Sequence, residues 1–312
     1  MTRVLSLGEC MIELTHRTAD ELVLGCAGDT FNTAAYLARL TAPEQLRVDY
    51  LTVLGDDHYS ERVLAAMRAE GIGTELIPQL PGEQPGLYLV RTDADGERHF
   101  TYYRSRSAAR NLFGSAATSA EFDGYDLVHL SAITLQILAP EARERLHAAL
   151  ARYRDRGGRI SFDSNYRPAG WSGRQQAAAE IERFWRLAAI GLPTFSDERA
   201  LRGDDAPEST VERLRGLGVD EIAVKDGARG CVLYDGERTA HLPTTPVHPV
   251  VDSTAAGDAF NAAYLAARLT GTAPAEAVAR AHQLAGTVIG HRGAIVADEV
   301  LPKRPARARP NG

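Results

Sequence analysis

Cysteine is scarce in this sequence, and its arrangement excludes two common uses of the residue. The 312 residues include three cysteines, Cys10, Cys26 and Cys231, an odd number at wide spacing. No Cys-x-x-Cys pair and no Cys/His ligand spacing occurs, so neither a disulfide framework nor a zinc site is expected. Buried thiols are the interpretation that remains.

Long apolar runs and an excess of positive charge are also absent. No run reaches the ~18 residues that a membrane span needs. Glu9 interrupts the first segment too early for the apolar region of a signal peptide. A formal net charge of −6 argues against a general nucleic-acid surface. We therefore expect a cytoplasmic protein that binds neither membrane nor nucleic acid.

The glycine-rich fingerprint of dinucleotide-binding enzymes is missing as well. The first predicted strand runs into residues 7–12, where Gly8 is the single glycine and no GxGxxG occurs. This argues against a dehydrogenase. No internal repeat stands out, and 44% hydrophobic residues can fill a sizeable core. The length suits one large domain or two ordinary ones.

What the sequence does contain is a repeated alternation of strand-like and helix-like segments. Such alternation indicates an α/β fold with a mostly parallel sheet and crossover helices. Strands are predicted over 4–7, 48–54, 125–131, 159–162, 190–195 and 221–224, and helices over 29–40, 59–70, 140–156, 175–188 and 273–289, with a further helix after residue 258.

Two hairpins interrupt this alternation. Residues 86–90 and 98–103 alternate with a period of two around a turn at 93–96, and residues 231–235 and 238–242 form a second pair. The first hairpin should project from the main sheet. We expect the segments of about 10–28 and 84–106 to form a small β lid over the sheet edge where open α/β sheets bind ligands.

The most informative stretch is the turn of small residues that leads into the helix after position 258. Backbone N–H groups of Ala255, Ala256 and Gly257 can approach an anion closely at a helix start. Asp258 has two interpretations: a helix cap, or a base that accepts the proton of an attacking hydroxyl. Asp252 and two alcohols just upstream favour the second.

Other polar residues follow predicted strands or begin predicted helices. Asp29 or Thr30 can cap the helix over 29–40, and Asn32 lies one turn into it. Arg104 and Arg167 stand at two separate loop ends. Either arginine could simply be solvated or salt-bridged, with Asp163 as the partner of Arg167. Alternatively, a guanidinium can bind a substrate carboxylate bidentately.

Residues 252–258, Asp-Ser-Thr-Ala-Ala-Gly-Asp, resemble the C-terminal signature Asp-Thr-x-Gly-Ala-Gly-Asp of the PfkB, or ribokinase-like, sugar kinases. Ser253 and Ala255 replace the usual Thr and Gly, and Ala255 therefore needs a backbone conformation that a Cβ can tolerate. The motifs at 8–13, 85–88, 102–104, 165–168 and 254–258 are together similar to the family members that phosphorylate 2-keto-3-deoxygluconate.

The resemblance implies a single ribokinase-like kinase domain over 1–312. It implies transfer of the ATP γ-phosphoryl group to a primary sugar hydroxyl, with Mg²⁺ arriving on the nucleotide and no protein metal ligand. Asp258 would be the base, and Ala255, Ala256 and Gly257 would steady the transferred group. The implied substrate-binding residues are Gly28, Asp29, Asn32, Tyr88, Tyr102, Arg104, Ile133, Arg167 and Asp258; those for ATP are Asn165, Lys225, Gly227, Gly230, Ala255 and Gly257.

The chain departs from the family pattern in two places. Ala27 stands where the N-terminal Gly-Gly-x-x-x-Asn pattern has its first glycine, and no Asn-x-x-Glu precedes Glu198, which makes that residue a minor candidate for the magnesium–phosphate site. A fructokinase, a ketogluconate kinase and a non-catalytic sugar sensor of the same fold remain alternatives. The sequence leaves open a homo-oligomer formed through the lid, and residues 303–312 are expected to be a flexible tail.

Overall fold

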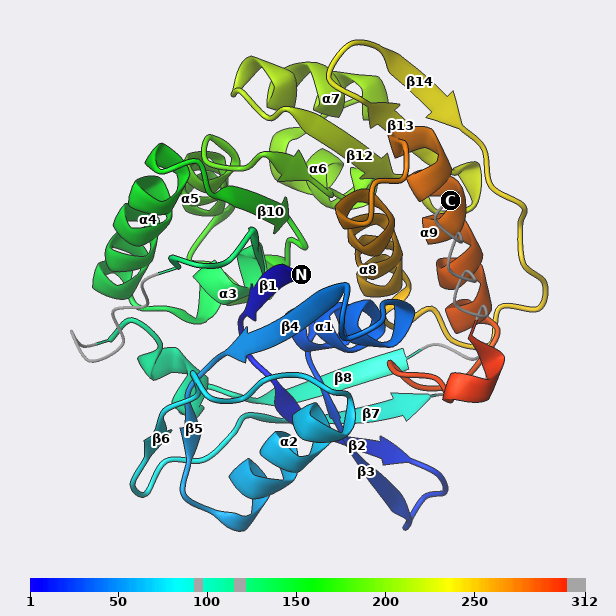
Figure 1. Ribbon diagram of the computed structural model, residues 1–312. Coiled ribbons are helices and arrows are strands. Elements are labelled where there is room, and N and C mark those ends of the chain that lie inside the picture. Colours follow the sequence, from blue (N-terminus) through cyan, green and yellow to red (C-terminus); the bar gives the residue numbers. More distant parts are fainter. Residues whose placement is uncertain (93–97, 115–121, 302–312) are drawn as a thin grey trace, which may run out of the picture.

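A computed structural model describes residues 1–92, 98–114 and 122–301 (Figure 1). The predicted turn at 93–96 and the predicted tail at 303–312 lie outside these residues. The described chain forms an eight-stranded sheet with helices on both faces, and a smaller sheet beside it.

The central sheet is parallel from β4 to β12 and ends in an antiparallel hairpin. Its order is β14-β13-β12-β11-β10-β9-β1-β4. A mostly parallel sheet, as predicted, is thereby confirmed. The strands are β1 (Thr2–Leu7), β4 (Leu46–Leu51), β9 (Leu127–Ser131), β10 (Arg159–Asp163), β11 (Ile190–Gly191), β12 (Glu221–Lys225), β13 (Cys231–Tyr234) and β14 (Thr239–Leu242).

Two hydrophobic clusters fill the space between this sheet and its helices. One cluster joins the sheet to α1 (Asp29–Leu40), α2 (His58–Ala69), α8 (Ala256–Leu269) and α9 (Pro274–Ile289). The other joins it to α3 (Ala132–Ile137), α4 (Pro140–Asp155), α5 (Arg174–Trp185), α6 (Phe195–Arg202) and α7 (Pro207–Gly216). Burial on both faces explains why the strands read as nearly continuous apolar runs.

Helices α1 and α8 lie side by side (Figure 1). Their buried faces are rich in alanine, which lets two helix backbones approach closely; the buried alanines include Ala34, Ala35, Ala259, Ala262 and Ala263. This packing brings residues 226 positions apart in the chain to the same end of the sheet.

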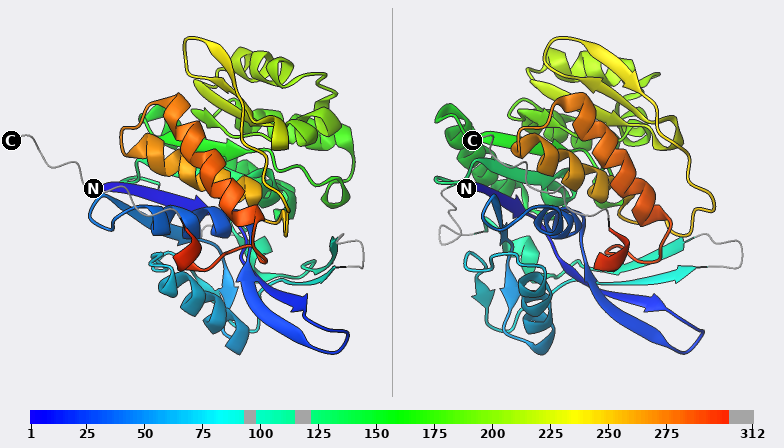
Figure 2. Two further views of the ribbon diagram at one scale, coloured as in Figure 1. Left: turned by 90° about the vertical axis from the view of Figure 1, so that its right-hand side faces the viewer. Right: turned by 45° about the vertical axis from the view of Figure 1, so that its right-hand side comes forward.

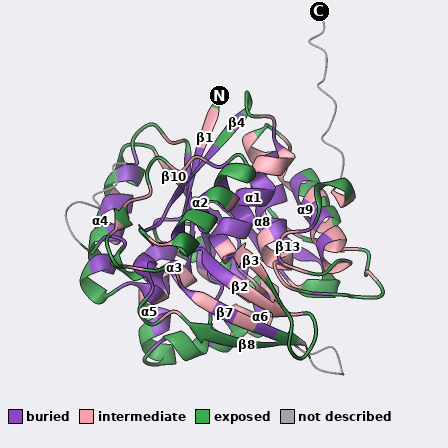
Figure 3. Cartoon of the chain, turned by 90° about the horizontal axis from the view of Figure 1, so that it is seen from below, coloured by how far each residue is buried: buried purple, intermediate pink, exposed green. Residues whose placement is uncertain are grey.

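The small sheet has the order β3-β2-β7-β8 and projects from the body of the molecule (Figure 2). It consists of β2 (Met11–His16), β3 (Leu22–Ala27), β7 (Leu87–Thr92) and β8 (Arg98–Tyr103). Both segments predicted for the lid therefore pair into one sheet. Strand β8 lies at its edge and is mostly exposed (Figure 3). The remaining short elements are β5 (Leu54–Gly55), β6 (Gln79–Leu80), η1 (Ala108–Asn111), η3 (Pro168–Gly170), η4 (Gly227–Arg229) and η5 (Asp298–Val300).

The prediction of a strand over 190–195 was too long. Regular pairing covers only Ile190 and Gly191, and Phe195 already begins α6. Pro193 has no N–H for the ladder, which limits a strand at that point. The other predicted helices and strands begin and end within a few residues of their predicted positions.

The cysteines and the apolar helices agree with the sequence-based expectations. Cys10 and Cys231 are buried, Cys26 is half-buried, and all three are free. Burial raises the pKa of the Cys10 and Cys231 thiols, so they are poor nucleophiles. Within residues 1–92, 98–114 and 122–301, no helix has the length and apolarity to cross a lipid bilayer.

Candidate active site

The carboxyl ends of the central parallel strands meet the N-termini of α1 and α8. Ser131 ends β9, Asp163 ends β10 and Lys225 ends β12, while Asp29 begins α1 and Asp258 lies in the first turn of α8. Helix N-termini and polar strand ends at this edge are the usual position of ligands in open α/β sheets.

Asp258 is oriented by α1. Its Oδ2 accepts a hydrogen bond of 2.8 Å from Asn32 Nδ2, and Asn32 Oδ1 in turn accepts from the Gly28 amide at 3.4 Å. Gly28 must be a glycine, because a Cβ there would lie 2.1 Å from the backbone oxygen of Glu9. The close passage of two backbone segments thus places Asn32 where it can hold the carboxylate.

Asp258 does not cap α8, so the cap interpretation was wrong. The cap position belongs to Ala255, and Asp258 is the third residue of the helix. Burial, together with the nearby charge of Asp29, raises the pKa of the Asp258 carboxyl well above its ordinary value. A carboxyl with a raised pKa beside two helix N-termini is a candidate general base.

Asp29 also does not cap its helix. Gly28 holds the cap position of α1, and Asp29 is the first helical residue. Its Oδ2 accepts hydrogen bonds from the Ser131 hydroxyl and from Asn165 Nδ2, the latter at 2.8 Å. Asn165, predicted to touch nucleotide, therefore ties the end of β10 to α1. The φ angle of Asn165 is 28°, an uncommon backbone conformation that persists only where surrounding contacts hold it.

In the turn before α8, Ala255 stands where the family usually has glycine, and its backbone conformation is one that favours glycine. Ala255 adopts φ 58° and ψ 11°, in the left-handed region that favours glycine. The Ala256 amide donates to the Ser253 carbonyl at 3.3 Å. The first amides of an α-helix have no partner within the helix, so Gly257 and Asp258 can offer their N–H groups to an anion.

Lys225 is enclosed beneath this turn. Its Nζ lies 2.7 Å from Asp163 Oδ2 and 2.8 Å from Asn261 Oδ1, and Asn261 Nδ2 donates to the same Asp163 oxygen at 2.7 Å. A Cβ on Gly257 would point at Nζ from 3.6 Å. The ammonium is therefore a fixed positive charge below the amides of Gly257 and its neighbours, and its side chain is only 8% exposed.

The backbone geometry of the turn after β12 explains why glycine occurs at two of its positions. Gly227 has a φ of 56° and Gly230 a φ of 102°. A Cβ on Gly230 would lie 2.3 Å from the Leu242 oxygen, so this turn passes directly against the segment that follows β14. A cavity of about 540 Å³ lies between that segment and α9; it is lined by Pro243, Thr244, Thr245, Val247, Ala279, His282, Gln283, Gly286 and Thr287.

The predicted substrate residues of the small sheet form their own cluster. Arg104 is paired with Glu9, and its guanidinium carbon lies 5.8 Å from the centre of the Tyr102 ring. The Tyr88 hydroxyl donates to Glu13. The Tyr88 and Tyr102 rings lie 5.6 Å apart.

Tyr102 lies in electrostatic range of groups on both sides of the site. Burial raises the pKa of Tyr102, the charges of Arg104 and Arg167 oppose that rise, and the charge of Asp29 adds to it. Arg167 is half-exposed and donates to the Tyr166 carbonyl at 3.0 Å and to Asp197 at 3.5 Å. The salt bridge predicted between Arg167 and Asp163 was wrong, because Asp163 is occupied by Lys225.

Ile133 and Glu198 lie in two different helices, α3 and α6. Ile133 lies at the start of α3, half-buried, and its amide donates to the Ser131 hydroxyl at 3.2 Å. Glu198 is fully buried in α6 and paired with Arg213 at 2.7 Å. Burial raises the pKa of Glu198. Among the described residues, no group of three or more His, Cys, Asp or Glu side chains could hold a metal ion.

Sequence reasoning missed several contributors. Glu9, Ser131, Asp163, Asn261 and Arg98 all make contacts that organise the site. Asn261 carried a usable signal, since residues three apart lie on the same face of a helix. The others could not be found without the tertiary structure, because their partners are distant in the chain.

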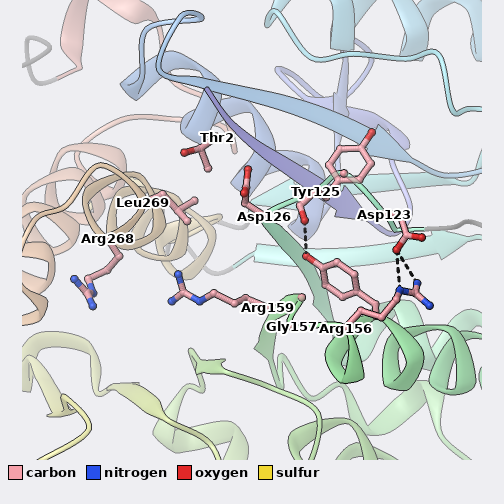
Figure 4. A pocket seen from close by; sticks show the side chains of 12 residues that line it. Thr2, Asp123, Tyr125, Asp126, Arg156, Gly157, Arg159, Arg268 and Leu269 are labelled. Atoms are coloured by element: carbon pink, nitrogen blue, oxygen red, sulfur yellow. Dashed lines mark hydrogen bonds and ion pairs between the residues drawn. The ribbon is translucent and has the colours of Figure 1, made fainter.

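A second depression lies at the opposite edge of the sheet (Figure 4). It has a volume of about 460 Å³ and is lined by the amino ends of β1 and β10 and by the last turn of α8. Arg156 is paired with Asp123 at 2.7 Å, and Arg268 with Glu221 at 2.8 Å. Those two guanidinium groups have carboxylate partners, and Arg159 is a third arginine of the lining.

Comparison with known proteins gives consistent matches over the whole chain. A family model described as "pfkB family carbohydrate kinase" matches residues 1–300. The 2-dehydro-3-deoxygluconokinase of Escherichia coli K12 is 40% identical over 306 residues, covering 96% of this chain and 99% of that protein. The enzyme of the same name from Dickeya dadantii is 40% identical over 302 residues, covering 95% and 97%. A crystal structure of a PfkB protein from Polaromonas sp. JS666 superposes with a TM-score of 0.83 at 27% identity, covering 96% of this chain and 99% of that one.

Proposed function

The chain belongs to the pfkB family of carbohydrate kinases, and from this premise we propose that it transfers the γ-phosphoryl group of ATP to 2-dehydro-3-deoxygluconate, also called 2-keto-3-deoxygluconate. The relatives at 40% identity carry the substrate assignment. The observation that carries the chemistry is the Asp258 carboxylate, held by Asn32 at the start of α8.

Asp258 accepts the proton of the sugar's primary hydroxyl as that oxygen attacks phosphorus. Asn32 orients the carboxylate, and the raised pKa gives it the basicity that proton transfer near neutral pH requires. The amides of Ala255, Ala256 and Gly257 lie beside the position where charge develops, and the ammonium of Lys225 lies below them. Ala256 gives up or shares its bond of 3.3 Å to Ser253 when it contributes.

The acid group of the sugar binds at the small sheet. Arg104 and Arg167 both act on Tyr102 electrostatically, so their charges converge on one region. Arg104 already faces a carboxylate, that of Glu9, and a substrate carboxylate takes the guanidinium's other N–H groups or replaces Glu9. Tyr88, Tyr102 and Ile133 contact the carbon chain, while Gly28, Asp29 and Asn32 orient its hydroxyls.

ATP fits the features on the other side of Asp258. The turn with Gly227 and Gly230 abuts the segment that lines the 540 Å³ cavity, a volume in the range of small-molecule sites. Exposed Val250 and Val251 continue that segment toward the 252–257 loop and offer apolar contacts. We assign the adenine of ATP to this cavity and its phosphates to Asn165, Gly227, Gly230 and Gly257. Lys225 acts through its charge because its side chain is enclosed.

Mg²⁺ accompanies the nucleotide in this proposal. The ion would neutralise charge on the phosphates, which is the role it commonly has in phosphoryl transfer. The donors at this edge are single carboxylates with protein partners, such as Asp29 with Asn165 and Glu198 with Arg213. They fit an ion held mainly through phosphate and water.

Exposed apolar side chains on both faces of the small sheet, and its edge strand, suit association with a second copy. Leu22, Val23, Phe100 and Tyr103 are each more than two-fifths exposed, and β8 is an edge strand. We propose that the small sheet acts as a lid, that two copies associate through it and that the enzyme, a single kinase domain, is cytoplasmic. Sedimentation equilibrium tests the dimer, since a monomer at micromolar concentration contradicts it.

The function is tested by measuring ADP formation with 2-keto-3-deoxygluconate, fructose and 2-ketogluconate side by side. We expect kcat/KM for the deoxy acid to exceed that for fructose by at least about 10²-fold, since fructose has no carboxylate to accept charge-assisted hydrogen bonds from Arg104. Turnover of fructose at an equal rate would identify a fructokinase. A ligand-dependent rise in Tm without ADP formation would identify a sugar sensor.

A further inference from the structure

Arg98, the first residue of β8, connects the small sheet to the loop that precedes α8. Its Nη1 lies 2.6 Å from Asp252 Oδ1 and also donates to the Thr254 hydroxyl. The two partners are more than 150 positions away in the chain. The arginine side chain is 13% exposed and that of Asp252 is 6% exposed, so this ion pair is shielded from solvent.

Three donors bond to the Asp252 carboxylate. Besides Arg98, its Oδ1 accepts from the Thr254 amide at 2.9 Å, and its Oδ2 accepts from the Gly293 amide at 2.8 Å. Burial alone would raise the pKa of Asp252, but the bonds from Thr254, Gly293 and Arg98 outweigh burial and lower it. Asp252 is therefore a charged anchor for the 252–257 loop.

The loop held by this anchor contains a strained residue. Ala255 has a positive φ of 58°, and such residues persist only where the surroundings enforce them. Arg98 and Asp252 fix Thr254, the residue directly before it. The amides at the start of α8 follow Thr254 directly, so their arrangement depends on this anchor.

An apolar contact joins the same two parts of the molecule. Met11, Ala27, Tyr88 and Val90 of the small sheet form a buried cluster with Ala294, and Ala255 packs against that cluster. Arg98 also lies on the same strand face as Phe100, with 5.4 Å between its guanidinium carbon and the ring centre. Polar and apolar contacts thus couple the small sheet and the loop independently.

We propose that Arg98 is a positioning residue for phosphoryl transfer: it ties the small sheet to Asp252 and Thr254 and so holds the amides of residues 255–257 in their working arrangement. The inference rests on the proposed kinase activity. It predicts that losing Arg98 impairs turnover more than sugar binding, because the sugar contacts lie elsewhere on the small sheet.

The test compares Arg98→Met with Arg98→Lys and with Arg91→Met, an exposed arginine of β7 in the same sheet. We expect Arg98→Met to lower kcat at least tenfold while the KM for the sugar acid changes less than threefold. Arg98→Lys, which keeps one cationic donor, should recover most of the loss. Arg91→Met should match the wild type within twofold.

Hydrogen exchange of the 252–257 amides, without substrates, gives a readout independent of turnover. Exchange should be at least tenfold faster in Arg98→Met than in Arg91→Met. Unchanged exchange, or a kcat equal to that of Arg91→Met, overturns the proposal and leaves Arg98 as a structural contact. If Arg98→Met does not fold, Arg98→Lys decides in the same two assays. If the wild type turns over none of the sugars, the proposed function fails, and the exchange comparison still decides whether Arg98 positions the loop.

Discussion

The two sides of the site are held in different ways. Beneath the start of α8, Lys225, Asp163 and Asn261 are buried and bond to one another at 2.7–2.8 Å. On the small sheet, Tyr102 is half-exposed, and the arginines bridge to other elements through single ion pairs. Asp258 thus lies above a buried, hydrogen-bonded network, whereas the predicted sugar contacts lie on a sheet that joins the body through ion pairs and one small apolar cluster. A fixed general base combined with sugar-binding groups that can move is the arrangement that lid closure needs.

The largest expected effect is on the side that carries Asp258. Asp258→Asn keeps the shape of the side chain but removes the base, so kcat should fall by at least about 10²-fold, the usual size of general-base catalysis. The KM for the sugar acid should change little. Steady-state kinetics on the purified variant measures both, and a near-normal kcat would mean that Asp258 serves structure alone.

Asp258 should also couple activity and stability to pH in opposite directions. Between the ordinary carboxyl pKa of about 4 and its raised value, the folded protein binds this proton more tightly than the unfolded chain does. The free energy of unfolding therefore falls as pH rises through that window, while the base becomes active. Asp258→Asn should be more stable than the wild type above the window. If the melting curves of the two proteins compare in the same way at pH 5 and at pH 9, the raised pKa of Asp258 is contradicted.

Lys225→Met tests how much the buried network stabilises the side that carries Asp258. Removal of one partner leaves Asp163 buried without its counter-ion, which typically costs about 3–5 kcal/mol. The free energy of unfolding from urea titration measures the loss. As a control, Arg280→Met breaks an exposed pair with Glu276 and should cost less than about 1 kcal/mol. Similar losses for both variants would show that burial does not matter here.

Arg104→Ala tests the small sheet. A charge-assisted pair is worth about 1.5–3 kcal/mol, so the KM for the sugar acid should rise roughly 10- to 100-fold while kcat changes much less. Arg106→Ala, two residues along and exposed, is the matched control. An unchanged KM in Arg104→Ala would remove this residue from carboxylate binding and shift that role to Arg167.

The smallest effect is expected where the two sides meet. Ala255→Gly should relieve left-handed strain of about 1–2 kcal/mol and lose the partial burial of one methyl, worth less than about 0.8 kcal/mol. The variant should therefore be at least as stable as the wild type. Ala256→Gly, inside the helix, should lose about 0.5–1 kcal/mol. If calorimetry ranks Ala255→Gly below Ala256→Gly, the strain at this position is not real.

Much of the architecture was readable from the chain. The helix predicted over 29–40 has those bounds in the structure, and the two hairpins form as the period-two patterns indicate. The strand predicted over 190–195 was too long, and the caps considered for Asp29 and Asp258 do not occur, because Gly28 and Ala255 hold the cap positions. Local propensity describes what a side chain can do for its own turn, but these carboxylates face partners on other elements.

Periodicity, turn residues and the spacing of short motifs determined the α/β fold, the family and the position of the Asp258 turn, because each of these depends on neighbours a few residues apart. The partners of the charged groups were decided only by the tertiary structure: Lys225 with Asp163, Arg104 with Glu9, Arg98 with Asp252. Coulombic pairing depends on distance in space and on the exclusion of water, and neither quantity is written in the order of the residues.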